Sequence, residues 1–185
     1  MMRTFIAIDL PESFENNIEK IQREFKKTGG DIKFVDPRKV HITLKFLGEI
    51  NEELVNKVEI KLDQCLKNID PFDIIVEDIG VFPSTDYIKV IWLGVGKGSY
   101  ILEKMNDGIE ESLSELGFDK ESREFIPHAT IGRVKSGKNK EDIVEVVERN
   151  RGSYIGEMPV DRVKIKQSNL TSKGPIYSDI SEVIL

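Results

Sequence analysis

The sequence contains very little cysteine, tryptophan and histidine. Among 185 residues there are one cysteine, one tryptophan and two histidines. A single thiol excludes an internal disulfide, and the absence of disulfides favours a reducing, intracellular compartment. Cys65 stands among Leu62 and Leu66 on the apolar side of an expected helix, which favours buried packing over nucleophilic chemistry.

Long hydrophobic runs are also missing. No apolar stretch approaches the roughly 20 residues that cross a bilayer, and the aspartate at position 9 comes too early for the apolar core of a signal peptide. We therefore expect a cytoplasmic protein that does not associate with membranes. With 39% hydrophobic and 32% charged residues, the composition is that of an ordinary globular protein.

An excess of positive charge is missing too. The formal net charge is −6 at pH 7, which argues against a general nucleic-acid binder, because such proteins neutralise many phosphates with Lys and Arg. The charge is nevertheless uneven. Segments 33–45 and 133–140 each hold four basic residues, and they surround or follow the two histidines. This distribution predicts a compact anionic ligand that is bound locally.

The two histidines occur in the same three-residue setting. His41 begins HITLKFLG and His128 begins HATIGR, so each is followed two positions later by a threonine, Thr43 or Thr130. Alternate side chains of a strand share a face, so each imidazole stands beside a hydroxyl. A hydroxyl can donate a hydrogen bond to a phosphate oxygen, and an imidazole titrates near neutral pH. Two such pairs predict acid–base catalysis at a phosphate, with one imidazole removing a proton and the other supplying one.

This chemistry needs no metal ion or other cofactor, and none is predicted. Two histidines without an evident third ligand make a poor zinc site, because catalytic zinc usually takes three protein ligands. The same alternation places Ile42, Leu44 and Phe46 on the core face of the first motif strand. It places Lys45 on the face of His41, where it is considered as a further phosphate contact, with an ordinary exposed lysine as the alternative.

Hydrophobic periodicity predicts the same order of elements twice. Each half is expected to hold strand, helix, motif strand, helix and strand, at an offset of about 87–89 residues. Segment 176–185 is expected as an additional strand. We predict the α+β class: a single bilobal domain over residues 1–185, with an internal repeat of roughly 1–86 and 87–175. Each lobe would be an antiparallel sheet with helices on its outer face, and a pseudo-two-fold axis would bring the motif strands together across a cleft.

Several segments resemble a known family. HITLKFLG and FIPHATIGR, with RTFIAIDLP near the start and GPIYS near the end, are similar to the LigT-like branch of the 2H phosphoesterases. Members are called 2′-5′ RNA ligases or RNA 2′,3′-cyclic phosphodiesterases, and the resemblance covers essentially the whole chain. It implies a hydrolase of RNA processing, tRNA included, that opens a 2′,3′-cyclic phosphate to a 2′-phosphate. The substrates would be RNA 3′ ends or small cyclic nucleotides, with no obligate protein partner, and some members also join RNA ends through a 2′,5′ bond.

The resemblance also implies roles for individual residues. His41 would be the proton donor to the 3′-oxygen and His128 the base that activates water. Thr43 and Thr130 would hold the phosphate. The lobes of the family interleave in sequence, and both ends of the chain belong to the same lobe.

An arginine follows the second histidine of the family by five residues, which corresponds to Arg133. Strict alternation would put Arg133 on the opposite face from His128 and Thr130. Gly132 offers a solution, because a glycine inside a strand often marks a bulge that redirects the next side chain. We therefore predict that Arg133 contacts the phosphate.

The aromatic residues are less determined. Phe5 shares a face with Arg3 and Ala7 and is considered as a base-stacking platform, with core packing as the alternative. Base stacking is equally open for Trp92 and Tyr177, with core packing as the default expectation.

Two other functions remain open. The chain could bind a nucleotide or an RNA end in the same cleft without catalysis, and a mononucleotide would then bind tightly without turnover. It could instead be a protein-interaction domain with incidental histidines, whose function would survive mutation of the motifs. If the chain is an enzyme, hydrolysis is expected to dominate over ligation in dilute solution, because nothing in the sequence indicates that water is excluded.

Overall fold

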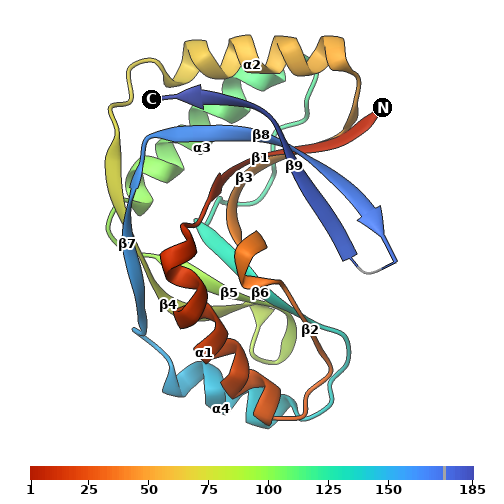
Figure 1. Ribbon diagram of the computed structural model, residues 1–185, viewed down its shortest axis with the longest axis vertical. Coiled ribbons are helices and arrows are strands. Elements are labelled where there is room, and N and C mark those ends of the chain that lie inside the picture. Colours follow the sequence, from red (N-terminus) through yellow and green to blue (C-terminus); the bar gives the residue numbers. More distant parts are fainter. Residues whose placement is uncertain (173) are drawn as a thin grey trace.

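A single curled sheet runs through the whole molecule (Figure 1). The computed structural model describes residues 1–172 and 174–185, and within them nine antiparallel-paired strands follow the order β7-β4-β5-β6-β3-β1-β8-β9, with β2 paired to β6. The strands are β1 Met2–Asp9, β2 Ile32–Phe34, β3 His41–Ile50, β4 Phe72–Ser84, β5 Tyr87–Val95, β6 His128–Val134, β7 Tyr154–Val160, β8 Arg162–Thr171 and β9 Gly174–Ile184. The α-helices are α1 Glu15–Lys27, α2 Glu52–Leu66, α3 Ser99–Ser114 and α4 Lys140–Arg149, and short 3₁₀ turns span Glu12–Phe14 and Pro37–Lys39.

The sheet has two halves that meet at the motif strands β3 and β6. Strands β2 and β4 to β7 form one half, against which α1 and α4 pack. Strands β1, β3, β8 and β9 form the other, against which α2 and α3 pack (Figure 1). The first strand pairs with β8, so both ends of the chain lie in the same half. The predicted α+β class with antiparallel strands is confirmed, and the two halves are continuous through β3 and β6.

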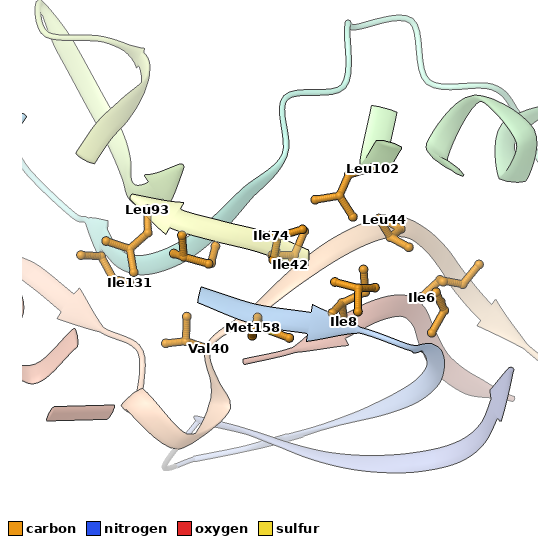
Figure 2. Packing of buried hydrophobic residues seen from close by; sticks show 14 of the residues in the cluster. Ile6, Ile8, Val40, Ile42, Leu44, Ile74, Leu93, Leu102, Ile131 and Met158 are labelled. Atoms are coloured by element: carbon orange, nitrogen blue, oxygen red, sulfur yellow. The ribbon is translucent and has the colours of Figure 1, made fainter. Parts of the chain in front are cut away.

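One hydrophobic core is shared by both halves. Figure 2 shows buried side chains of β3 (Ile42 and Leu44), β4 (Ile74) and β5 (Leu93) within the same cluster. Interiors of this kind are close-packed and resist displacement. The shared core therefore fixes the two motif strands relative to one another.

The helices are amphipathic, and each adds one apolar stripe to this core. In α1 the buried residues Ile18, Ile21 and Phe25 recur at helical spacing. The second helix begins after Asn51, whose side-chain oxygen accepts a hydrogen bond from the Leu54 amide at 2.9 Å. Among the described residues, no helix combines the length and the apolar character needed to cross a bilayer.

The sequence pattern does not identify β7. Gly156 and Pro159 interrupt the alternation between Tyr154 and Val160, yet this segment pairs with β4 at the edge of the sheet. An edge strand tolerates proline because one side of its backbone has no strand partner. A Cβ atom at Gly156 would lie 2.1 Å from Cε1 of Phe14, so the glycine makes room for that ring. Packing between distant segments, not local periodicity, creates this strand.

Candidate active site

The two histidine motifs meet where the halves of the sheet join. The ladder between β3 and β6 pairs Ile42 with Ala129, which are the middle residues of the two motifs. Because the strands are antiparallel, each histidine lies across from the threonine of the other motif. Ile42 and Ala129 are fully buried, so the histidines and threonines lie on the opposite face of the sheet, which we call the site face.

Each imidazole is held by the same hydrogen bond. Nδ1 of His41 lies 2.7 Å from the Lys39 carbonyl oxygen, and Nδ1 of His128 lies 2.7 Å from the Ile126 carbonyl oxygen. A carbonyl oxygen can only accept, so Nδ1 carries a proton in both rings and donates it. Nε2 is therefore the nitrogen that gains and loses a proton in each histidine.

Each motif strand has a one-residue bulge three positions after its histidine. Leu44 of β3 is skipped in the ladder with β1, and Ile131 of β6 is skipped in the ladder with β5. An extra residue reverses the facing of every side chain that follows it. Arg133 consequently shares the site face with Thr130. The predicted redirection of Arg133 is confirmed, and the skipped residue directly precedes Gly132.

A buried amide side chain supports each bulge. Nε2 of Gln22 in α1 donates to the carbonyl oxygens of Ile131 (3.0 Å) and Val35 (2.7 Å). Nδ2 of Asn106 in α3 donates to the carbonyl oxygen of Leu44 (2.7 Å). The two amides are only 2% and 6% exposed, so they fix the bulged backbone from within the core. Sequence reasoning missed both residues, although a polar residue within an apolar helical stripe was a usable signal.

We expect Gln22→Leu to lower the free energy of unfolding by about 1–3 kcal/mol, because two carbonyl oxygens lose this donor. Urea denaturation measures the change. Gln64→Leu, at an exposed position of α2, is the matched control and should change stability little. Equal stability losses in the two variants would show that Gln22 does not support the bulge.

The bulge at Leu44 also corrects two expectations for β3. Strict alternation places Phe46 in the core and Lys45 on the face of His41, and both placements are wrong. Phe46 is 61% exposed, whereas Lys45 is 4% exposed. The Lys45 ammonium lies 2.6 Å from Oε2 of Glu110 on α3, inside the protein. Lys45 is therefore directed away from the site face.

Aromatic rings flank both histidines. The neighbouring ring centroids are those of Phe5 (5.0 Å) and Tyr177 (5.2 Å) for His41, and of Phe82 (4.9 Å) and Trp92 (6.1 Å) for His128. Phe5 is only 3% exposed, which fits the core-packing alternative and leaves little of its face for a base. Tyr177 and Trp92, for which core packing was the default and base stacking the open alternative, are partly exposed on the site face. The exposed ring of Phe46 lies 6.1 Å from that of Phe5 and was not anticipated as part of this face.

Burial lowers the pKa of both imidazoles below its ordinary value. For His41 the hydrogen bond to Lys39 and the negative charge of Asp9, its partner across the β1–β3 ladder, act in the opposite direction. The positive charges of Lys166 and Arg133 lower the pKa of His41, and Arg133 also lowers that of His128. That one guanidinium acts on both rings fits the β3–β6 ladder, which brings the two motifs together.

Asp9 is held in place by a buried lysine. Nζ of Lys166 lies 2.7 Å from both carboxylate oxygens of Asp9 and 2.7 Å from Oδ1 of Asp179. The Lys166 side chain is 8% exposed, so this cluster is a fixed element of the site face. It supplies a carboxylate beside His41, and neither Asp9 nor Lys166 was anticipated from the sequence.

Comparisons with known proteins place the chain in one family. The family profile described as LigT like Phosphoesterase matches residues 8–92 and 99–177. The RNA 2′,3′-cyclic phosphodiesterase of Methanocaldococcus jannaschii is 42% identical over 181 residues, which cover 98% of this chain and 99% of the relative. The protein of the same name from Methanothermobacter thermautotrophicus is 35% identical over 179 residues, which cover 97% of this chain and 96% of the relative.

Solved structures with the same fold span the whole chain. The crystal structure of TT0787 of Thermus thermophilus has a TM-score of 0.79 at 26% identity, with 100% of this chain and 98% of that chain covered. The crystal structure of Escherichia coli LigT complexed with 3′-AMP has a TM-score of 0.78 at 22% identity, with 100% and 98% covered. At that lower identity, the likeness shows the fold alone.

Proposed function

The chain belongs to the LigT-like phosphoesterase family, and we propose that it is an RNA 2′,3′-cyclic phosphodiesterase, as its archaeal relatives are named. It would hydrolyse the cyclic phosphate at an RNA 3′ end to a 2′-phosphate. The observation that carries the proposal is the pairing of Ile42 with Ala129. This pairing sets two equivalent Nε2 atoms on one face, with the charge of Arg133 acting on both.

In the proposed reaction, His128 accepts a proton from water through Nε2 while the water oxygen bonds to phosphorus. The bond between phosphorus and the 3′-oxygen breaks, and Nε2 of His41 donates its proton to that oxygen. The products are a 2′-phosphate and a free 3′-hydroxyl. The hydroxyls of Thr43 and Thr130 donate hydrogen bonds to the non-bridging oxygens, and Arg133 balances their negative charge.

The surroundings of the two rings support this division of roles. A general acid must be protonated before the reaction, and the negative charge of Asp9 favours the protonated form of His41. Burial and Arg133 lower the pKa of both rings, and only at His41 does a carboxylate, that of Asp9, offset part of this lowering. These influences favour His41 as the acid and His128 as the base.

We expect Asp9→Asn to lower the pKa of His41, because a nearby negative charge is lost. Since His41 must be protonated to act as the acid, the alkaline limb of the kcat/KM profile should move to lower pH. NMR titration of the two imidazoles together with the pH profile measures both effects. The control Asp63→Asn removes the same charge at an exposed position of α2. It should change neither the pKa of His41 nor the alkaline limb of the kcat/KM profile. An unchanged alkaline limb in Asp9→Asn would contradict the assignment of His41.

The proposed function is tested with a short RNA that ends in a 2′,3′-cyclic phosphate, incubated with the protein and EDTA. We expect complete conversion to the 2′-phosphate. Turnover that EDTA abolishes, or a 3′-phosphate product, would overturn the mechanism. Tight binding of the RNA end without turnover would identify the chain as a non-catalytic binding module.

Ligation follows the same route with a different nucleophile. If the 5′-hydroxyl of a second RNA replaces water, its attack on phosphorus and the release of the 3′-oxygen give a 2′,5′ bond. We expect hydrolysis to dominate at low RNA concentration, where water is in vast excess. Ligated RNA as the main product under those conditions would contradict this expectation.

We place this activity in the cytoplasm. The single cysteine fits a reducing compartment. Burial raises the pKa of the Cys65 thiol, which disfavours its reactive thiolate form. The proposed partners are RNA 3′ ends, and a small cyclic nucleotide would be the minimal substrate of the same site.

A further inference from the structure

A basic groove is lined by Arg133 and lies outside the two histidines. It has a volume of about 420 Å³ and is lined by residues of the β4–β5 hairpin, the end of β6 and the start of α4. These elements lie in the lower half of Figure 1. Its charged lining residues are four cations, Lys89, Arg133, Lys135 and Lys140, against the single carboxylate of Asp86. This concentration of positive charge contrasts with the net charge of −6 of the whole chain. The groove therefore suits an anionic ligand.

The strand β5 connects this groove to the active site along one face of the sheet. Trp92 beside His128 and the next alternate residue, Val90, lie on the site face, and Val90 pairs with Arg133. Strict alternation would put Tyr87, three residues from Val90, on the opposite face. Lys89 is skipped in the ladder with β4, and this bulge places Tyr87 on the site face instead. At about 3.3 Å per residue, Tyr87 lies roughly 10 Å along the strand from Val90. Tyr87, Val90 and Arg133 therefore line the groove from the same face of the sheet that carries the histidines.

Tyr87 presents an open aromatic face at the outer end of the groove. It is 61% exposed, and the ammonium of Lys89 lies 5.1 Å from its ring centroid. Aromatic side chains beside cations are the usual means of binding single-stranded RNA, because the rings stack on bases and the cations contact phosphates.

A second cavity, of about 470 Å³, lies on the other side of His128 but has the opposite charge. Trp92 and Pro127 line it together with the acidic residues Glu77, Asp78 and Glu103. Carboxylates repel a phosphate chain. The electrostatics therefore direct an RNA strand toward Arg133 and Tyr87.

We propose that the basic groove binds the RNA segment on the 5′ side of the terminal cyclic nucleotide. Lys135 and Lys140 contact its phosphates, and Tyr87 stacks on one of its bases. The preferred substrate is then an oligoribonucleotide and not a cyclic mononucleotide. This inference rests on the proposed function, because it takes the cyclic end to lie at the histidines.

The test compares a cyclic mononucleotide, 2′,3′-cyclic AMP, with a hexaribonucleotide that ends in a 2′,3′-cyclic phosphate. The wild-type protein should have the higher kcat/KM on the hexanucleotide. Tyr87→Ala should raise KM for the hexanucleotide about ten-fold through loss of stacking. The double variant Lys135→Gln/Lys140→Gln should also raise the KM for the hexanucleotide, and this KM should depend less on salt concentration than in the wild-type protein. Both variants should leave mononucleotide turnover unchanged, and Tyr87→Trp should restore the hexanucleotide KM.

The chain offers closely matched controls. Tyr100 on α3 is 64% exposed and has the Lys104 ammonium 4.5 Å from its ring centroid, which repeats the arrangement of Tyr87 with Lys89 outside the groove. Tyr100→Ala should therefore leave both substrates unaffected. Lys57→Gln/Lys67→Gln removes two charges, one from α2 and one from the residue that caps its C-terminus, and should also leave both substrates unaffected.

The outcomes separate the two proposals. If the groove variants change both substrates equally, or neither, the groove is not an RNA-binding surface, although cyclic phosphodiesterase activity stands. If the wild-type protein turns over neither substrate, the proposed function fails. The groove is then tested by fluorescence anisotropy with the labelled hexanucleotide: weaker binding in Tyr87→Ala supports it, and unchanged binding overturns it.

Discussion

His41→Ala and His128→Ala are each expected to reduce kcat on an RNA 2′,3′-cyclic end by about 10²–10⁴-fold, the usual contribution of one general acid or base. Each variant removes an Nε2 atom that the other histidine cannot replace, because that histidine is already committed to the opposite proton transfer. The double variant should be little worse than either single variant, since the two groups act as a unit. Rapid-quench measurement of kcat with EDTA present gives the three values.

Loss of activity must be separated from loss of folding. Both imidazoles lie on the site face and neither is part of the hydrophobic core, so the alanine variants should unfold at nearly the wild-type temperature. Thr130→Ser keeps the hydroxyl beside the phosphate and should retain most of the activity. Hydrolysis that persists at the wild-type rate in a folded double variant would refute the two-histidine mechanism.

Lys45→Met is expected to destabilise the protein by about 3–5 kcal/mol, because it leaves a buried carboxylate without its partner. The Lys45 side chain is 2% exposed and its ammonium lies 2.6 Å from Oε2 of Glu110, whose side chain is 11% exposed. The ammonium also donates to the Asp119 carbonyl oxygen at 2.9 Å. Urea denaturation measures the loss. The folded variant should keep its KM, since Lys45 points away from the site face.

Two further variants make this prediction specific. Lys57→Met breaks an exposed ion pair with Glu53 on α2 and should cost at most about 0.5 kcal/mol. Lys45→Met/Glu110→Gln removes both charges and should recover part of the lost stability. If Lys45→Met is as stable as Lys57→Met but has a raised KM, then Lys45 contacts the phosphate and the assignment to the core is wrong.

Local patterns were sufficient to predict most of the fold. Apolar periodicity places α1 to α4 and most strands, and alternation correctly separates Ile42 from its neighbours His41 and Thr43. The order of strands and helices within residues 1–86 and within residues 87–175 follows from the same patterns. What they do not reveal is that β1 and β8 pair, because pairing depends on contacts between residues far apart in the sequence.

The misplacement of Lys45 and Phe46 has one physical origin. A bulge is a property of two paired strands, so the alternation of residues in one strand's sequence does not predict it. The bulge at Leu44 moves Lys45 into the core and Phe46 out of it, and the bulge at Ile131 moves Arg133 onto the site face. Only the second was anticipated, because Gly132 gave a local signal.

The central claim is that His41 and His128 hold one phosphate between them. The chain contains two histidines, so its ¹H–¹⁵N imidazole spectrum reports these two rings and nothing else. During titration with inorganic phosphate, both Nε2 signals should move with the same Kd, and the pKa of both rings should rise because a bound anion favours the imidazolium form. If only one ring responds, or the two respond with different Kd values, the histidines do not share a phosphate and the claim is contradicted.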